Sequence, residues 1–587
     1  MNILLCAINT KFIHSSLAIR SLRANTEYAK YVSLVEFSIN NNINYMLKDI
    51  YIKAPDVLCF SCYIWNIEIV KELIKTVKKI LPNVKIVLGG PEVSYTPIEF
   101  LNEYADIVVL GEGEKVFNKL CKHFIFGAPD LTKIEGIAYC ESSPDSKTKK
   151  NFINNLCALP DLNTLVFPYT DIDLHDLSNK ILYYESSRGC PYSCAYCLSS
   201  VAENVRFWDV EITKTHIDFF LANSIKLVKF VDRTFNCNPN RAIEIWKHII
   251  KSDNGHTCFH FEIGADLLSQ GQIDCLKDAR KGLIQFEAGV QSTNQKTLKE
   301  ICRVTDLKKL SENIVKIKDL DNIHIHLDLI AGLPYEDFNS FKKSFNDCFK
   351  LQPDMLQLGF LKLIKGSALW KKADDYGIAY KDSAPYEVGF TKHISYGELL
   401  MLKDIENLLD LYYNGGLFST SLNYFLEKFN EPFDFFYNFS LFWNENGYYK
   451  ESHNKHKRYE ILFRYASGLD SVDLDFFKNL LKFDMFMSEN IKNLPTCLTG
   501  TDYAPIKGSI NAFFANEDNA RLYFPKFLGR SLKELRRICH IEEFSYNVPY
   551  FIRSKCRETA KNYCLFVYDE TRPKVYTIDL SERRGLG

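Results

Sequence analysis

The sequence predicts an α/β protein made of two consecutive strand–helix regions and a mainly helical C-terminal third with some strands. Short apolar runs alternate with longer amphipathic stretches from residue 1 to about 140, and again from 181 to about 360. This alternation is typical of parallel sheets covered by helices. From about residue 386 helical periodicity dominates, for example over 398–413 and 476–487, before strand-like runs at 564–568 and 575–580.

Five apolar runs in the first region are expected to form the buried strands of a doubly wound parallel sheet. They are residues 3–8, 32–37, 57–61, 85–88 and 107–110. Helical stretches such as 67–80 follow them. In sheets of this kind, ligands bind beyond the carboxyl ends of the strands.

Glycines and polar residues gather at those carboxyl ends. The segments are Ser61 to Asn66, Gly89-Gly90-Pro91-Glu92 and Gly111-Glu112-Gly113-Glu114. Paired glycines let the backbone approach a large flat ligand or a phosphate, and helix N-termini behind them favour anionic groups. Glycines are also common at such turns for conformational reasons alone, so the turns by themselves leave both interpretations open.

The second region repeats the strand–helix pattern six times. Its expected strands are residues 181–187, 227–231, 258–263, 283–288, 323–330 and 355–360. Directly after the first strand, Cys190, Cys194 and Cys197 have the spacing C-x3-C-x2-C. A structural zinc site or an ordinary ferredoxin cluster uses four protein ligands, so three thiols leave one iron of a 4Fe–4S cluster open. A zinc knuckle that lacks its fourth ligand is the alternative.

The composition excludes few classes of protein, but it argues against some kinds of binding partner. The chain has 587 residues, enough for about three to four domains. With 72 basic and 73 acidic side chains, a nucleic-acid partner is not expected. No apolar run approaches the roughly 20 residues that span a bilayer, and no secretion signal is recognisable. The eighteen scattered cysteines are therefore expected to be reduced thiols in a cytoplasmic protein.

The cysteine motif, with Tyr196 before its last cysteine, resembles that of the radical S-adenosylmethionine (SAM) superfamily. The glycine turns are similar in order and spacing to the cobalamin-binding domain of one large class in that superfamily. The resemblance implies four segments: a Rossmann-like cobalamin-binding domain at 1–145, a linker at 146–180, a partial (βα)6 TIM-like radical SAM barrel at 181–385, and a C-terminal domain of unknown function at 386–587. It also implies three cofactors: a 4Fe–4S cluster, SAM and cobalamin.

The resemblance assigns candidate residues to each cofactor. The cluster ligands are the three cysteines of the motif. The expected SAM contacts are Asp232, Glu262, Glu287 and Gln291, and the expected cobalamin contacts are Ser61, Trp65, Gly89, Gly90, Gly111 and Glu112. The D-x-H-x-x-G loop that supplies a histidine to cobalt in other cobalamin modules is missing, and His14 is expected not to bind the metal. His324 and His326 alternate along one strand and are expected to line the core or the barrel. No catalytic residue is assigned.

The function implied by the resemblance is reductive cleavage of SAM to a 5'-deoxyadenosyl radical, with methyl transfer from methylcobalamin to a carbon of a small-molecule or peptide substrate. An external electron donor of the flavodoxin or ferredoxin type would be needed. Cyclisation or rearrangement by the same chemistry stays open. A methylthiotransferase is a further alternative, although Cys6, Cys59 and Cys62 lack the separation of its second cluster motif. A cobalamin or iron–sulfur redox sensor is the non-enzymatic alternative.

Overall fold

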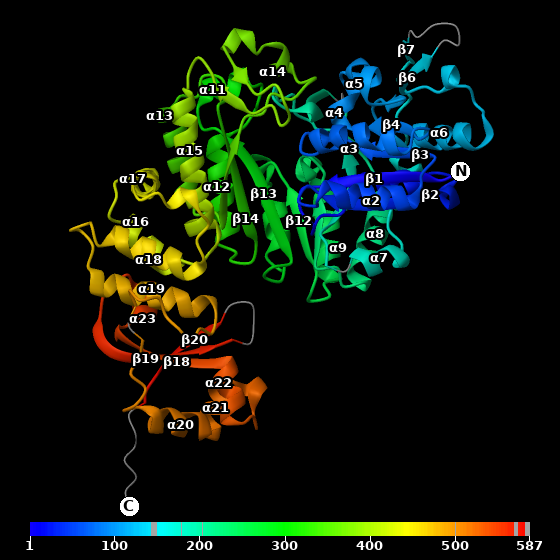
Figure 1. Cartoon of the computed structure of the whole chain (residues 1–587). Coiled ribbons are helices and arrows are strands. Elements are labelled where there is room, and N and C mark those ends of the chain that lie inside the picture. The colour runs from blue at the N-terminus through cyan, green and yellow to red at the C-terminus, as the bar shows by residue number, and fades with distance from the viewer. Residues whose placement is uncertain (143–148, 178, 202–203, 499, 569–572, 581–587) are drawn as a thin grey trace, which may run out of the picture. The chain divides into compact units, whose positions relative to one another are not determined.

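The computed structural model describes residues 1–142, 149–177, 179–201, 204–498, 500–568 and 573–580. It divides into two compact units, Met1–Leu399 and Leu400–Gly587. The first unit contains two large sheets, coloured blue to cyan and green in Figure 1. Among the helices of the described residues, none combines the length and the apolar composition that crossing a membrane requires.

The first sheet has seven strands in the order β2-β1-β3-β4-β5-β6-β7. The strands from β1 to β5 run parallel, whereas β6 and β7 are antiparallel additions at one edge. Their bounds are Ile3–Asn9, Val32–Ser38, Val57–Ser61, Lys85–Gly89, Ile107–Val109, Ile137–Ser142 and Lys149–Ile153. The five expected strands are confirmed. β7 lies inside the stretch expected as a linker, and its sequence KKNFI gives little apolar signal.

Helices cover both faces of this sheet. Their bounds are Leu17–Ala24 (α1), Ile43–Lys53 (α2), Ile67–Ile80 (α3), Pro91–Ser94 (α4), Pro97–Glu103 (α5) and Glu114–Phe126 (α6). Alternate residues of β1 enter different cores, because side chains of a strand alternate between faces. Leu4 packs in one core with Val70 of α3, and Leu5 packs in the other with Phe117 of α6. The sheet is therefore buried on both sides, as expected for a doubly wound fold.

The second sheet has six parallel strands in the order β15-β14-β13-β12-β11-β8. All six expected strands are present, and β8 and β15 form the edges of an open, partial barrel. The strand bounds are Leu182–Tyr184 (β8), Leu227–Phe230 (β11), Cys258–Glu262 (β12), Ile284–Gln291 (β13), His324–Ala331 (β14) and Met355–Phe360 (β15). The intervening helices are Val210–Ala222 (α8), Pro239–Lys251 (α9), Gln270–Leu276 (α10), Gln295–Glu300 (α11), Leu307–Lys318 (α12) and Phe338–Phe349 (α13).

Strand β13 shows how this sheet separates apolar from polar side chains. Ile284 and Phe286 are buried, while Glu287 and Gln291 alternate with them and are only partly buried. Since successive side chains of a strand point to opposite faces, the polar set lies on the side away from the apolar core. The interior of the partial barrel is consequently lined by polar groups.

Shorter elements complete the first unit. They are Asp171–Leu177 (α7), Ser187–Arg188 (β9) paired with Arg206–Phe207 (β10), Ala368–Lys371 (α14), and Ala379–Tyr380 (β16) paired with Val388–Phe390 (β17). The β9 strand leads directly into the cysteine loop. It therefore connects the edge of the barrel to the motif.

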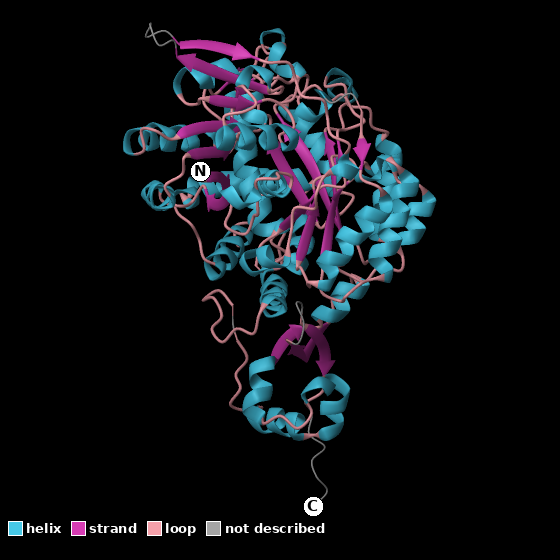
Figure 2. Ribbon diagram, turned by 90° about the vertical axis from the view of Figure 1, so that its right-hand side faces the viewer, coloured by secondary structure: helices cyan, strands magenta, loops and turns pink. Residues whose placement is uncertain are grey.

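The second unit begins within helix α15, Tyr396–Leu409, and is mainly helical, as expected. Its helices are Ser419–Leu426 (α16), Pro432–Glu445 (α17), Lys455–Ala466 (α18), Leu474–Ser488 (α19), Lys507–Ala515 (α20), Glu517–Tyr523 (α21), Leu532–Ile538 (α22) and Val548–Ser554 (α23). Figure 2 shows its antiparallel three-stranded sheet, which comprises Cys539–Tyr546 (β18), Thr559–Val567 (β19) and Lys574–Ile578 (β20). β18, whose polar residues interrupt the apolar pattern, was not predicted.

Candidate functional site

A cavity of about 770 Å³ opens at the carboxyl ends of the first sheet. All six residues expected at the carboxyl ends of these strands line it, namely Ser61, Trp65, Gly89, Gly90, Gly111 and Glu112. Its inner wall is apolar, with Leu5 and Val87 of the sheet and Phe117 of α6. The cavity therefore extends from a polar mouth into the layer between the sheet and its helices.

Gly90 fixes the shape of the turn after β4. Its φ of 112° lies in a region that residues with a side chain rarely adopt. A Cβ atom at this position would lie 2.5 Å from the carbonyl oxygen of Cys62. The amide of Cys62 in turn donates to the carbonyl of Gly89 at 2.7 Å. Only glycine allows the two loops to pack this closely.

Aromatic rings form part of the mouth. Trp65 stacks on Tyr63 with ring centroids 4.3 Å apart, and its side chain is 42% exposed. Its indole N–H donates to the carbonyl of Ile8 at 3.1 Å, which fixes the ring. The Ser61 hydroxyl is buried and has no hydrogen-bond partner among the described residues. A flat apolar surface and an unsatisfied hydroxyl thus belong to the same cavity wall.

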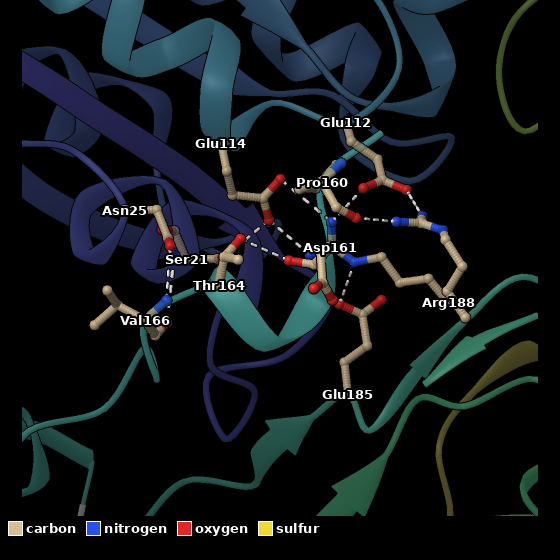
Figure 3. Close-up of polar contacts among 11 residues, drawn as sticks. Ser21, Asn25, Glu112, Glu114, Pro160, Asp161, Thr164, Val166, Glu185 and Arg188 are labelled. Carbon is tan, nitrogen blue, oxygen red and sulfur yellow. Dashed lines mark hydrogen bonds and ion pairs between the residues drawn. The ribbon is translucent and has the colours of Figure 1, made fainter. Parts of the chain in front are cut away.

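Glu112 also belongs to an ion-pair network with the loop that leads to the cysteines (Figure 3). Arg188 lies 2.7 Å from Glu112, 2.6 Å from Glu114 and 2.8 Å from Glu185. Arg206 pairs with Glu112 as well. Burial acts to raise the pKa of Glu114, but the hydrogen bond and charge of Arg188 outweigh it and lower this pKa overall. The network therefore ties the turn after β5 to the start of the cysteine loop.

A second cavity, of about 210 Å³, lies at the carboxyl ends of the barrel strands. Cys190, Cys194 and Cys197 all line it. The Sγ of Cys194 is 3.7 Å from the guanidinium of Arg303, and the Sγ of Cys190 is 3.8 Å from the hydroxyl of Thr234. In the described part of the chain, no group of three His, Cys, Asp or Glu side chains is spaced to hold one metal ion. Three thiols along one wall suit a multi-iron cluster, in which each thiolate binds its own iron.

Three of the four expected SAM contacts, Glu262, Glu287 and Gln291, line this second cavity. Glu287 accepts hydrogen bonds from Lys229 and from His260, each at 2.9 Å. Burial acts to raise the pKa of Glu287, but these two neighbours outweigh it and lower the pKa to about 2. The Oε1 of Gln291 is buried without a hydrogen-bond partner in the described structure. Its unsatisfied oxygen is free to accept a hydrogen bond from a ligand.

Asp232 has a different place from the one expected. It is buried, lines neither cavity, and accepts hydrogen bonds from the Ser186 amide at 2.9 Å and from the Ser186 and Ser187 hydroxyls at 2.6 Å. These three hydrogen bonds hold the backbone that leads into the cysteine loop. The sequence could not distinguish this bracing role from ligand binding, because both need an acid after the second barrel strand.

Three charged residues of the second cavity were not assigned to a cofactor from the sequence. Arg233, next to Asp232, lines both cavities. Arg303 lies in a loop without a motif, 109 residues from Cys194, so no local signal indicates it. Asp328 has a buried Oδ1 without a hydrogen-bond partner in the described structure, and burial with the charges of Glu287 and Glu262 raises its pKa. Its alternation with His326 on β14 was the available signal.

The three histidines discussed from the sequence have different surroundings. His14 lines the large cavity, but its Nδ1 lies 2.7 Å from the Tyr183 hydroxyl. His326 is buried inside the barrel, 3.4 Å from Asp328. His324 lies at the exposed start of β14. The contact engages only the Nδ1 of His14, and metal-binding histidines often make such a hydrogen bond through their other ring nitrogen, so the absence of a bond to cobalt stays a prediction.

Two models of known protein families match the parts of the chain that carry the two cavities. Residues 3–120 match the family model described as B12 binding domain, and residues 184–348 match the Radical SAM superfamily. The chain is a radical SAM protein with a cobalamin-binding domain. Residues 374–566 of this radical SAM protein match a further family described only as a protein of unknown function, DUF4080.

Relatives of this radical SAM protein agree with the assignment. It is 28% identical over 320 residues to the cobalamin-dependent radical SAM methyltransferase TokK of Streptomyces tokunonensis, covering 50% of this chain and 44% of TokK. It is 22% identical over 350 residues to the anaerobic magnesium-protoporphyrin IX monomethyl ester cyclase of Cereibacter sphaeroides, covering 56% of this chain and 54% of the cyclase. The matches thus span about half the length of these relatives.

Its fold is shared by OxsB, a cobalamin-dependent SAM radical enzyme whose structure holds aqua-cobalamin and SAM. The TM-score is 0.56 at 16% identity, over 90% of this chain and 85% of OxsB. At this identity the likeness shows the fold alone.

The residues of the two cavities fit the cofactors of the radical SAM protein. The large cavity combines an apolar interior, a glycine-dependent turn at Gly90, the exposed ring of Trp65 and the unsatisfied hydroxyl of Ser61. These features suit a large, flat ligand with amide groups at its edge. The small cavity joins three thiols to a buried amide oxygen of Gln291. This set suits a cluster with one open iron and a polar ligand bound to it.

Proposed function

We propose that this protein is a cobalamin-dependent radical SAM enzyme that cleaves SAM reductively and transfers a methyl group to a carbon of a small molecule. One observation carries the proposal. The cavity of the first sheet and the cysteine-lined cavity of the barrel share Arg233 and Ser199 in their walls. A cofactor in the large cavity would therefore face a ligand bound at the cysteine site.

The cofactors supply the chemistry when bound: the cluster gives the electron that cleaves SAM, and cobalamin carries the methyl group. The chain supplies the arrangement. Cys190, Cys194 and Cys197 would hold three irons, and Glu262 and Gln291 would bind the ammonium and ribose groups of SAM. Glu287, already paired with Lys229 and His260, would serve as a fixed negative charge beside them.

The large cavity would hold cobalamin without a protein ligand to cobalt. Ser61, Gly89, Gly90 and Gly111 would bind through the hydroxyl and the backbone, and Trp65 would cover the ring face. Glu112 would act chiefly through its pairs with Arg188 and Arg206, which hold the turn beside the cysteine loop. The apolar inner wall would exclude water from the bound cofactor.

The remaining assignments are parts of the same proposal. Radical cleavage needs one electron at a time, so we propose a flavodoxin or ferredoxin type donor. The eighteen scattered cysteines and an oxygen-sensitive cluster favour a reducing compartment, and we propose the cytoplasm.

Turnover tests the proposal. The protein is reconstituted anaerobically with iron, sulfide and cobalamin, then given dithionite and SAM. We expect 5'-deoxyadenosine and S-adenosylhomocysteine, with both products lost in Cys194→Ala. A redox sensor would bind the cofactors and form neither product, which would refute the enzymatic function.

Cyclisation or rearrangement is the second candidate, favoured by the match to the cyclase over 350 residues. Methyl-deuterated SAM separates the two once an acceptor is found. A methyltransferase places the deuterium label in the product, whereas a cyclase leaves it in SAM or methionine.

A further inference from the structure

Three arginines line the two cavities in the part of the chain that the structure describes: Arg188, Arg233 and Arg303. Arg188 is neutralised by three glutamates within 2.9 Å. Arg303 donates to the carbonyl of Gly289 and lies beside the Cys194 sulfur. No hydrogen bond or ion pair joins the guanidinium of Arg233 to any residue that the structure describes, and Arg233 is exposed. It is the cation of this site that remains available to a ligand.

The nearby carboxylates are already used by other groups. Glu185 pairs with Arg188, Glu287 pairs with Lys229, and Asp232 accepts from the two serines before the cysteine loop. The exception is Glu262 on the wall of the small cavity. The charge of Arg233 acts to lower the pKa of Glu262, although burial dominates and raises it. Glu262 lies beyond the 4 Å of an ion pair, so it does not neutralise Arg233.

We propose that Arg233 is the anchor for a carboxylate or phosphate group of the substrate, so that the enzyme acts on an acidic small molecule. This inference rests on the proposed function and specifies its substrate class. Arg233 belongs to both cavity walls, so an anion bound there lies where a cofactor in one cavity faces a ligand in the other. A guanidinium binds such anions through two parallel hydrogen bonds, which fixes orientation as well as position.

The carboxylate of SAM has the same chemistry, so the experiment must separate the two sources. The reconstituted protein is treated anaerobically with an arginine-selective dicarbonyl reagent, and modified arginines are counted by mass spectrometry. We expect Arg233 to react about tenfold faster than the ion-paired Arg188. Acetate should slow the reaction of Arg233, whereas acetamide, its neutral isostere, should not. Arg23, outside both cavities and 45% exposed, is the control for effects on the reagent itself.

Adding SAM gives the deciding comparison. The inference predicts that acetate still protects Arg233 when SAM is saturating. If SAM alone protects Arg233 fully and acetate adds nothing, Arg233 serves SAM and the inference is overturned. Equal protection by acetate and acetamide, or by neither, also overturns it. In Glu262→Gln, which removes the remaining nearby carboxylate, protection by acetate should be stronger.

A labelled acceptor screen separates this inference from the proposed function. A small-molecule extract is divided by anion exchange into acidic and neutral fractions, and each is incubated with enzyme and methyl-labelled SAM. Label in the acidic fraction, reduced at least tenfold in Arg233→Gln and partly restored in Arg233→Lys, supports the anchor. Label in the neutral fraction alone overturns the anchor and leaves methyl transfer intact. Label in neither fraction counts against the proposed function, and the acetate result then decides whether Arg233 binds anions.

Discussion

The two cavities of the first unit are lined by different kinds of residue. The cavity of the first sheet is shaped by glycines, apolar side chains and a stacked aromatic pair. The barrel cavity is lined by thiols, carboxylates and arginines. The first is therefore expected to recognise its ligand by shape and the second by bonds and charge. It follows that backbone changes should impair the first, whereas removal of single side-chain atoms should impair the second.

The largest effect is expected in the barrel cavity. Cys194→Ala removes one of three cluster ligands, so iron binding and SAM cleavage should both be lost. Iron content by colorimetry and 5'-deoxyadenosine by chromatography measure the two effects. Cys302→Ser is the matched control, since Cys302 is an exposed thiol next to Arg303 that lines neither cavity. Retention of iron and cleavage in Cys194→Ala would show that the motif does not hold the cluster.

Shape dependence is tested by two glycines of the first cavity. Gly90→Ala combines a disfavoured φ with a clash against Cys62, and should reduce stability by about 1–3 kcal/mol and abolish cobalamin binding. Gly111→Ala is the control. Gly111 has a φ of 74° but open space around it, so a loss of only about 1 kcal/mol is expected. Denaturant unfolding and cobalamin absorbance after desalting give both readouts. Equal effects of the two changes would exclude close packing as the cause.

An effect on stability alone is expected where the two cavities are joined. Glu114→Ala removes one buried ion-pair partner of Arg188. The arginine keeps its other two partners, Glu112 and Glu185. We therefore expect a loss of about 1–3 kcal/mol, less than for a pair whose only partner is removed. Glu135→Ala, which breaks an exposed pair with Lys119, should change stability by less than about 1 kcal/mol. Thermal unfolding of both variants is the measurement, and equal shifts would contradict a structural role for the network.

The smallest expected effect is a loss of stability at acidic pH. Burial lowers the pKa of His216 and of His326 to about 4, and both belong to the barrel region. In the unfolded chain these histidines take up protons near pH 6.5, above their pKa in the folded protein. Their neutral burial should therefore cost no stability above pH 6.5, and the free energy of unfolding should fall as the pH drops from 6.5 to 4. Replacing His216 by Gln should reduce this slope by about one proton. A slope unchanged in the His216 variant would contradict its buried, neutral state.

The sequence pattern predicted where the strands of both sheets lie along the chain, but it did not predict every contact. The strands of both sheets were recognisable because apolar runs and glycine turns repeat locally, and the three cysteines because a cluster loop is continuous in sequence. Arg303 reaches the same cavity from a loop 109 residues away from Cys194, so no local pattern in the sequence indicates it. Asp232 shows the converse: it follows the second barrel strand as expected, but it lines neither cavity and accepts hydrogen bonds from Ser186 and Ser187, which precede the cysteine loop.

The central claim is that three cysteines of the barrel hold a cluster with one iron left open to SAM. Electron paramagnetic resonance of the reconstituted, dithionite-reduced protein tests it most directly, with spectra recorded before and after addition of SAM. We predict a reduced 4Fe–4S signal whose g-values change when SAM is added, and no such signal in Cys190→Ala, Cys194→Ala or Cys197→Ala. A cluster signal that SAM leaves unchanged, or that persists without these cysteines, would contradict the account.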